Sequence, residues 1–159
     1  MEIAYYLLLP MNDSCDVSGA GTFETRVITP DEFDAYRVLL SKKFDLIVQQ
    51  VDPELRLAGK ATPDVVLEDE QWELKCPNGN NAKKTIGRNI NKAIRQMHNS
   101  STPDKVNIIL SALATALPSG IVVNQARASM SKGLIDNMIV IANEGQLIRM
   151  KKDGQEEII

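Results

Sequence analysis

The amino-acid sequence predicts an α/β fold in which a mixed β-sheet is flanked by helices. Short β-prone runs alternate along the chain with segments of helical periodicity, in the order α-β-β-β-α-β and then α-β-β. Of the 159 residues, 43% are hydrophobic, which is sufficient for one buried core. With 9 Gly and 7 Pro, the composition excludes a disordered, collagen-like or low-complexity chain.

The first expected helix has a complete start signal. Thr29 is suited to the N-cap position and Pro30 to the first helical position, and two acidic residues follow them. Apolar residues then recur at roughly helical spacing to about Lys43. The helix should therefore lead into a β-prone segment at 45–51, which ends at Asp52.

A β-hairpin is expected next. The β-prone runs 64–67 and 71–76 flank a short acidic turn at 68–70. A segment dense in turn formers follows at 77–81.

A second helix is expected over residues 83–98, because apolar residues recur there at helical spacing. These residues are Ile86, Ile90, Ala93, Ile94 and Met97. Basic residues fall at steps of four, four and three, so they should form a stripe on the opposite face. The stripe consists of Lys84, Arg88, Lys92 and Arg95.

The remaining segments complete the expected sheet. A strand is expected at 105–110, a helix at 121–132, and a hairpin formed by 137–142 and 146–150, with a frayed tail after it. No linker or internal repeat interrupts the chain. We therefore expect a single domain over residues 1–159, with a core at about 30–112 and an additional helix and hairpin at 113–159.

Several functional classes are excluded by composition. The apolar run at 3–10 is far shorter than the roughly 20 residues of a transmembrane helix and lacks the flanks of a signal peptide. Cys15 and Cys76 form neither a disulfide framework nor a metal-ligand pair. Because His98 is the one histidine, zinc sites built from several His or Cys ligands are excluded.

Charge is distributed unevenly, although the net charge is only -3. Residues 1–74 carry 6 basic and 15 acidic side chains, whereas residues 75–105 carry 7 basic side chains and one acidic side chain, Asp104. The basic segment is either a solubilising helix face or a contact surface for nucleic acid.

The residues that could perform chemistry lie in the expected hairpin. Glu73 and Lys75 should share one face of a strand, while Trp72 and Leu74 point to the other. Asp64 joins them if the hairpin register brings it opposite. Carboxylates are suitable ligands for Mg²⁺ or Mn²⁺, and a lysine can orient water or neutralise developing charge, so this set suits phosphodiester hydrolysis.

These motifs resemble the PD-(D/E)xK nuclease superfamily, and within it the nuclease domains at the C-termini of bacterial contact-dependent growth inhibition toxins. The resemblance rests on residues 62–66, 72–79 and 84–96. It implies that Asp64 and Glu73 bind Mg²⁺ or Mn²⁺, rather than Zn²⁺, and that Lys75 is the catalytic lysine. It also implies a further catalytic acid from the first helix. Glu32 is the best match for this acid and Asp34 the second.

The resemblance further implies a metal-dependent endonuclease that cleaves tRNA. Such a toxin acts in the cytoplasm, is delivered as part of a larger secreted protein and has a cognate immunity protein. The basic helix would then bind nucleic acid through Lys83, Lys84, Arg88, Lys92 and Arg95. Two alternatives remain open at this point: a DNA-cleaving enzyme of the same fold, and a catalytically inactive module that binds nucleic acid or a protein partner.

Overall fold

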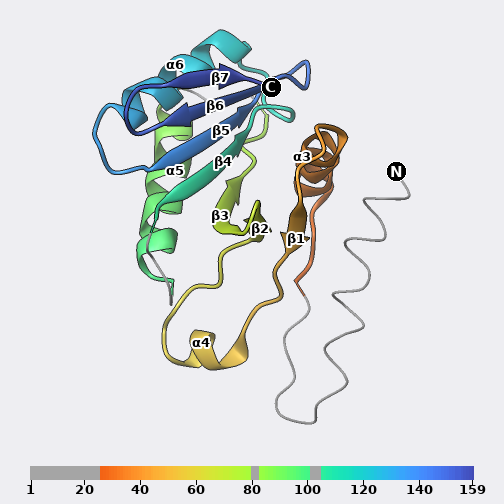
Figure 1. Cartoon of the computed structure of the whole chain (residues 1–159), viewed down its shortest axis with the longest axis vertical. Coiled ribbons are helices and arrows are strands. Elements are labelled where there is room, and N and C mark those ends of the chain that lie inside the picture. Colours follow the sequence, from red (N-terminus) through yellow and green to blue (C-terminus); the bar gives the residue numbers. More distant parts are fainter. Residues whose placement is uncertain (1–25, 80–82, 101–104) are drawn as a thin grey trace.

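The computed structural model describes residues 26–79, 83–100 and 105–159. Within them, seven strands form one sheet whose spatial order follows the chain (Figure 1). The central pairs β3–β4 and β4–β5 are parallel and all the others are antiparallel, so the predicted mixed sheet is confirmed. The strands are β1 (Leu46–Val48), β2 (Val65–Leu67), β3 (Glu70–Lys75), β4 (Asn107–Ser111), β5 (Asn137–Ile141), β6 (Leu147–Lys151) and β7 (Glu156–Ile158).

Helices cover both faces of this sheet. Helices α5 (Lys83–His98) and α6 (Ser119–Met130) pack against each other on one face, where they connect the parallel strands. Helix α3 (Pro30–Ser41) contributes to a second apolar cluster on the other face (Figure 1). The short helix α4 (Pro53–Leu57) lies in the connection between β1 and β2. The core therefore has two layers, one on each side of the sheet.

Both long helices predicted in the first two thirds of the chain are confirmed. Thr29 caps α3 with a capping box, in which its Oγ1 accepts from the Glu32 backbone N–H at 3.3 Å. Helix α5 has the predicted bounds, and its five predicted apolar residues are at most 9% exposed. The basic residues of α5 lie on its exposed side, as expected for an amphipathic helix.

The predicted hairpin is formed by β2 and β3, with Val65 opposite Trp72 and Leu67 opposite Glu70. The two turn residues, Glu68 and Asp69, have positive φ angles of 50° and 66°. Positive φ at both central positions is typical of the tight turns that match the twist of paired strands. The turn therefore holds the register, although neither residue is a glycine or asparagine.

Two expectations differ from the structure. The tail after residue 150 is not frayed, because β7 pairs with β6 and Arg127 of α6 holds Glu156 through two hydrogen bonds of 2.7 and 2.9 Å. The strand expected at 45–51 shortens to β1, and the chain after it forms α4, which Asp52 caps. Both features depend on pairing and capping contacts that hydrophobic periodicity does not detect.

Some expectations concern residues outside the described ranges. The apolar run at 3–10 and Cys15 belong to this part of the chain. Across the described residues, no helix combines the length and the apolarity needed to cross a membrane.

The two-layer core predicts that truncating a buried side chain of β4, the central strand, destabilises the protein strongly. Ile108 is fully buried, so Ile108→Ala should lower the free energy of unfolding by about 2–5 kcal/mol through lost burial and a residual cavity. Ile47→Ala, at a position that is 44% exposed on β1, should cost far less. Urea unfolding followed by the fluorescence of Trp72 measures both, and equal losses would contradict this core.

Candidate active site

Asp64 lies directly before β2 and reaches across to β3. Continuing the observed register by one residue places Asp64 opposite Glu73. The Oδ2 atom of Asp64 accepts a hydrogen bond of 2.8 Å from the backbone N–H of Leu74, so its carboxylate is fixed against the neighbouring strand. Asp64 is only 9% exposed. The hairpin register thus brings Asp64 opposite Glu73, as the grouping of Asp64, Glu73 and Lys75 required.

Glu73 and Lys75 share the other half of this site. The Lys75 amine donates to Glu73 Oε1 at 2.7 Å, and the two side chains are 13% and 4% exposed respectively. Glu73 and its β4 neighbour Ile108 lie on the face covered by α5, whereas Trp72 and Leu74 pack in the opposite cluster. This is the alternation that the strand pattern predicted.

The environment of Glu73 favours its neutral form. Burial and, next, the negative charge of Asp64 raise the pKa of this carboxyl, while Lys75 lowers it, and the balance of these effects gives a pKa of about 7. A carboxyl with a pKa near neutrality can both accept and release a proton at physiological pH. Perturbed acids of this kind are enriched at functional sites.

Arg26 is a site residue that the sequence did not indicate. Its guanidinium forms an ion pair with Asp64 Oδ1 and also donates to the carbonyl oxygens of Gln49 at 2.8 Å and Thr62 at 3.0 Å. Arg26 is separated from Asp64 by 38 positions, and no motif surrounds it. Only the folded chain brings the two together, so no local signal could have found this residue.

Two further polar groups belong to the apolar cluster on the α3 side of the sheet. The hydroxyl of Tyr36 is buried and has no hydrogen-bond partner within the described structure, and burial together with the charge of Asp64 raises its pKa. Burial also raises the pKa of Cys76 to about 12, with the charges of Glu32 and Asp31 adding to the effect. The Cys76 thiol therefore stays protonated at neutral pH and is not a reactive nucleophile.

The structure does not bring the third predicted acid to the carboxylate pair. Glu32 Oε1 accepts from the Thr29 hydroxyl at 3.0 Å, so its carboxylate serves the helix cap. Asp34 is exposed and pairs with Arg37 at 3.8 Å. Among the residues that the structure describes, no three His, Cys, Asp or Glu side chains form a group suited to a metal ion. Asp64 and Glu73 are the predicted ligands that do lie together.

The basic stripe of α5 faces solvent on the outer side of the helix layer. Its members Lys84, Arg88, Lys92 and Arg95 are all exposed, as is Lys83, the fifth residue predicted to bind nucleic acid. The opposite side of α5 packs on β3 and β4. The stripe and the carboxylates thus belong to adjoining elements, with the stripe directed away from the sheet.

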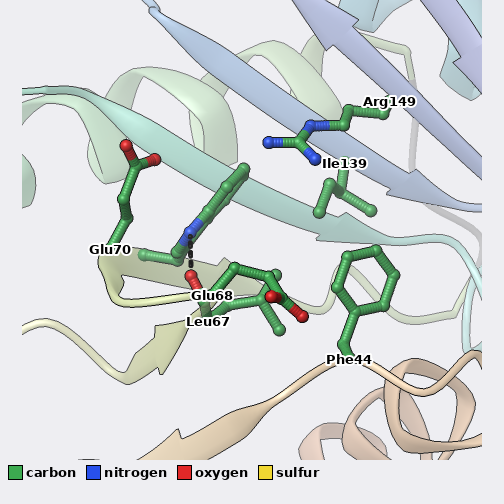
Figure 2. A pocket seen from close by; sticks show the side chains of 7 residues that line it. Phe44, Leu67, Glu68, Glu70, Ile139 and Arg149 are labelled. Carbon is green, nitrogen blue, oxygen red and sulfur yellow. Dashed lines mark hydrogen bonds between the residues drawn. The ribbon is translucent and has the colours of Figure 1, made fainter.

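A separate pocket lies on the other face of β3 (Figure 2). It has a volume of about 150 Å³ and is lined in part by Arg149, whose Nε atom is buried without a hydrogen-bond partner among the described residues. Trp72 lines this pocket and donates from its indole to the Leu67 carbonyl at 3.3 Å. Because Trp72 and Glu73 point to opposite faces, the pocket is distinct from the carboxylate site.

The raised pKa of Glu73 predicts a specific pH dependence of stability. Its folded pKa of about 7 exceeds the ordinary value of 4.5, so its stabilising contribution is complete below pH 4.5 and is lost as pH rises through 7. Relative to Glu73→Gln, the native protein should lose up to about 3 kcal/mol of unfolding free energy over this range. Urea unfolding at several pH values tests this, with the exposed-site variant Glu54→Gln as control, and parallel profiles for native protein and Glu73→Gln would contradict it.

Comparison with solved structures finds the same fold in a chain of the CdiA-CT/CdiI toxin and immunity complex from Burkholderia pseudomallei. The TM-score is 0.56 and the sequence identity is 17%, and the match covers 82% of this chain and 97% of that chain. No protein-family model matches the sequence, and no curated protein matches it either. The likeness establishes an α/β fold with a mixed sheet and flanking helices that is common to the two chains.

Proposed function

We propose that this chain is a metal-dependent endonuclease that hydrolyses phosphodiester bonds, with tRNA as the favoured substrate. One observation carries the proposal: the β2–β3 register places Asp64 opposite Glu73, and the Lys75 amine lies 2.7 Å from Glu73 Oε1. Two carboxylates and an amine in one partly enclosed site form a suitable set for phosphoryl chemistry.

The donor atoms of this site suit a hard divalent cation. Mg²⁺ is commonly held by one or two carboxylates, with waters and substrate phosphate oxygens completing its coordination. Asp64 and Glu73 supply that number of carboxylates, so these residues fit Mg²⁺ or Mn²⁺ without a third protein acid. When bound, such an ion lowers the pKa of coordinated water and stabilises charge on the phosphate.

The protein residues then divide the remaining tasks. The hydrogen bond from the Leu74 N–H orients Asp64 before substrate arrives, which reduces the reorganisation needed on binding. Glu73 would supply the second carboxylate to the ion, and the Lys75 amine, 2.7 Å from its Oε1, holds that carboxylate in place. Lys75 orients that water or neutralises the charge that develops on the phosphate.

A toxin function is the biological context that we propose for this chemistry. It is supported by the fold shared with a chain of a toxin and immunity complex, and by the resemblance of the hairpin motif to growth-inhibition toxins. Under this proposal the chain is delivered as part of a larger secreted toxin, acts on tRNA in the cytoplasm, and has a cognate immunity protein.

Substitutions at the carboxylate site provide the first test. Asp64→Asn, Glu73→Gln and Lys75→Met should each reduce cleavage of total bacterial tRNA by about 100-fold or more in Mg²⁺ or Mn²⁺. The exposed turn variant Asp69→Asn is the matched control and should retain full activity. Gel assays with and without EDTA, run in parallel on tRNA and plasmid DNA, measure the effect.

Each result of this assay has a defined meaning. Cleavage of plasmid DNA alone would replace tRNA with DNA as the substrate. Full activity in both Asp64→Asn and Lys75→Met would contradict the site assignment. If the folded protein binds nucleic acid without cleaving it, the chain is a binding module. Glu32→Gln keeps an acceptor for the helix cap, so a specific loss of cleavage in this variant would assign Glu32 a catalytic role.

The basic stripe predicts a salt-dependent contribution to substrate binding. The double substitution Arg88→Ala and Lys92→Ala should weaken tRNA binding and reduce the slope of log K against log salt concentration by about 1 for each lost phosphate contact. The double substitution Lys132→Ala and Lys151→Ala removes the same charge from exposed positions outside the stripe and is the control. Filter binding at several salt concentrations measures the slopes, and equal slopes in the two variants would exclude the stripe as the contact surface.

A further inference from the structure

We infer that Arg26 is an internal cation that competes with divalent ions for the Asp64–Glu73 carboxylate pair. This inference rests on the proposed metal-dependent function and assigns a role to a residue outside the nuclease motif. Its basis is a guanidinium bonded to the carboxylate that is proposed to hold the metal.

Two separate segments of the chain provide the hydrogen-bond acceptors that hold Arg26. Its Nε donates to the Gln49 carbonyl at 2.8 Å, and its Nη2 donates to the Thr62 carbonyl at 3.0 Å. Its backbone N–H donates to Gln50 Oε1 at 2.9 Å. The Arg26 side chain is only 15% exposed. These contacts hold the guanidinium in one orientation, so Arg26 is not a loosely placed surface cation.

This arrangement uses both carboxylate oxygens of Asp64. Arg26 occupies Oδ1, and the Leu74 N–H occupies Oδ2 at 2.8 Å. The Leu74 N–H belongs to the backbone of β3, so this hydrogen bond cannot be broken by moving the donor without disrupting the strand. Arg26, in contrast, reaches Oδ1 through its side chain, whose hydrogen bonds can be exchanged without breaking a strand pairing. A cation that coordinates Oδ1 would lie next to the guanidinium charge already bound to that atom, so the cation and Arg26 compete for Oδ1.

The charge balance of the cluster supports the same conclusion. Carboxylates bind a metal ion in their ionised form, and in that form Asp64 and Glu73 carry two negative charges, which Arg26 and Lys75 neutralise. Adding a divalent ion to this neutral, poorly hydrated cluster would leave two excess positive charges. Release of Arg26 reduces that excess to one. Because like charges repel more strongly where water is scarce, ion binding and Arg26 binding oppose each other.

Direct binding measurements test the competition. Isothermal titration of the full chain with Mn²⁺ should show at least about fivefold tighter binding for Arg26→Gln than for the native protein, a fold-change well within those observed for coupled sites. Arg127→Gln also removes an arginine from an ion pair, here with Glu156, and should leave the affinity unchanged. Asp64→Asn should abolish binding in either background.

A second measurement needs no substitution in the protein under test. The Nε–H resonance of Arg26, assigned by its absence in Arg26→Gln, is followed while the native protein is titrated with Mg²⁺. Displacement predicts a shift of this resonance and faster exchange of its proton with water, because the bond to the Gln49 carbonyl is lost. This readout remains valid even if Arg26→Gln is too unstable for calorimetry, since Arg26→Lys can supply the assignment.

The outcomes separate this inference from the proposed function. If Asp64-dependent binding persists with equal or weaker affinity in a folded Arg26→Gln, or if Mg²⁺ binds without moving the Arg26 resonance, the competition is wrong and the metal site stands. If neither the native protein nor Arg26→Gln binds either ion, the competition is wrong. In that case, cleavage in the presence of EDTA would show whether nuclease activity survives without a metal.

Discussion

The antiparallel register of the β2–β3 hairpin is the constraint on which the core and the candidate site both depend. With Val65 opposite Trp72, one face of the hairpin enters the apolar cluster beneath α3. The same register places Asp64 opposite Glu73 on the other face. A slip of one residue would exchange the faces and bury the charged groups in the apolar cluster. Core packing therefore selects the register that brings the two carboxylates together.

Placing charged groups at this position has an energetic cost that the structure offsets locally. Glu73 is compensated by Lys75 and Asp64 by Arg26 and the Leu74 N–H, so neither carboxylate is left without a partner. Removing one member of a buried ion pair is strongly destabilising because it leaves the other uncompensated. The raised pKa of Glu73 indicates that the compensation is incomplete.

Helix α5 links the site to a surface that could receive a polyanion. Its apolar face packs on β3 and β4, and its basic stripe lies on the exposed side of the helix. The two faces of strand β3 lie in different environments. Glu73 and Lys75 face the helix layer, while Trp72 lines the pocket that is also lined by Arg149 (Figure 2). The parallel β3–α5–β4 unit thus positions the stripe relative to Glu73 and Lys75.

Local sequence patterns determined the mixed α/β architecture, the capped start of α3, the bounds of α5 and the hairpin that contains Asp64 and Glu73. These features follow from periodicity, capping and turn chemistry, which act over a few residues. Tertiary structure alone decided the pairing of β7 with β6 and the contact of Arg26 with Asp64. The partners in the Arg26–Asp64 contact lie 38 positions apart, and Arg127 of α6 holds Glu156 of β7 across 29 positions, so only the folding of distant segments brings them together.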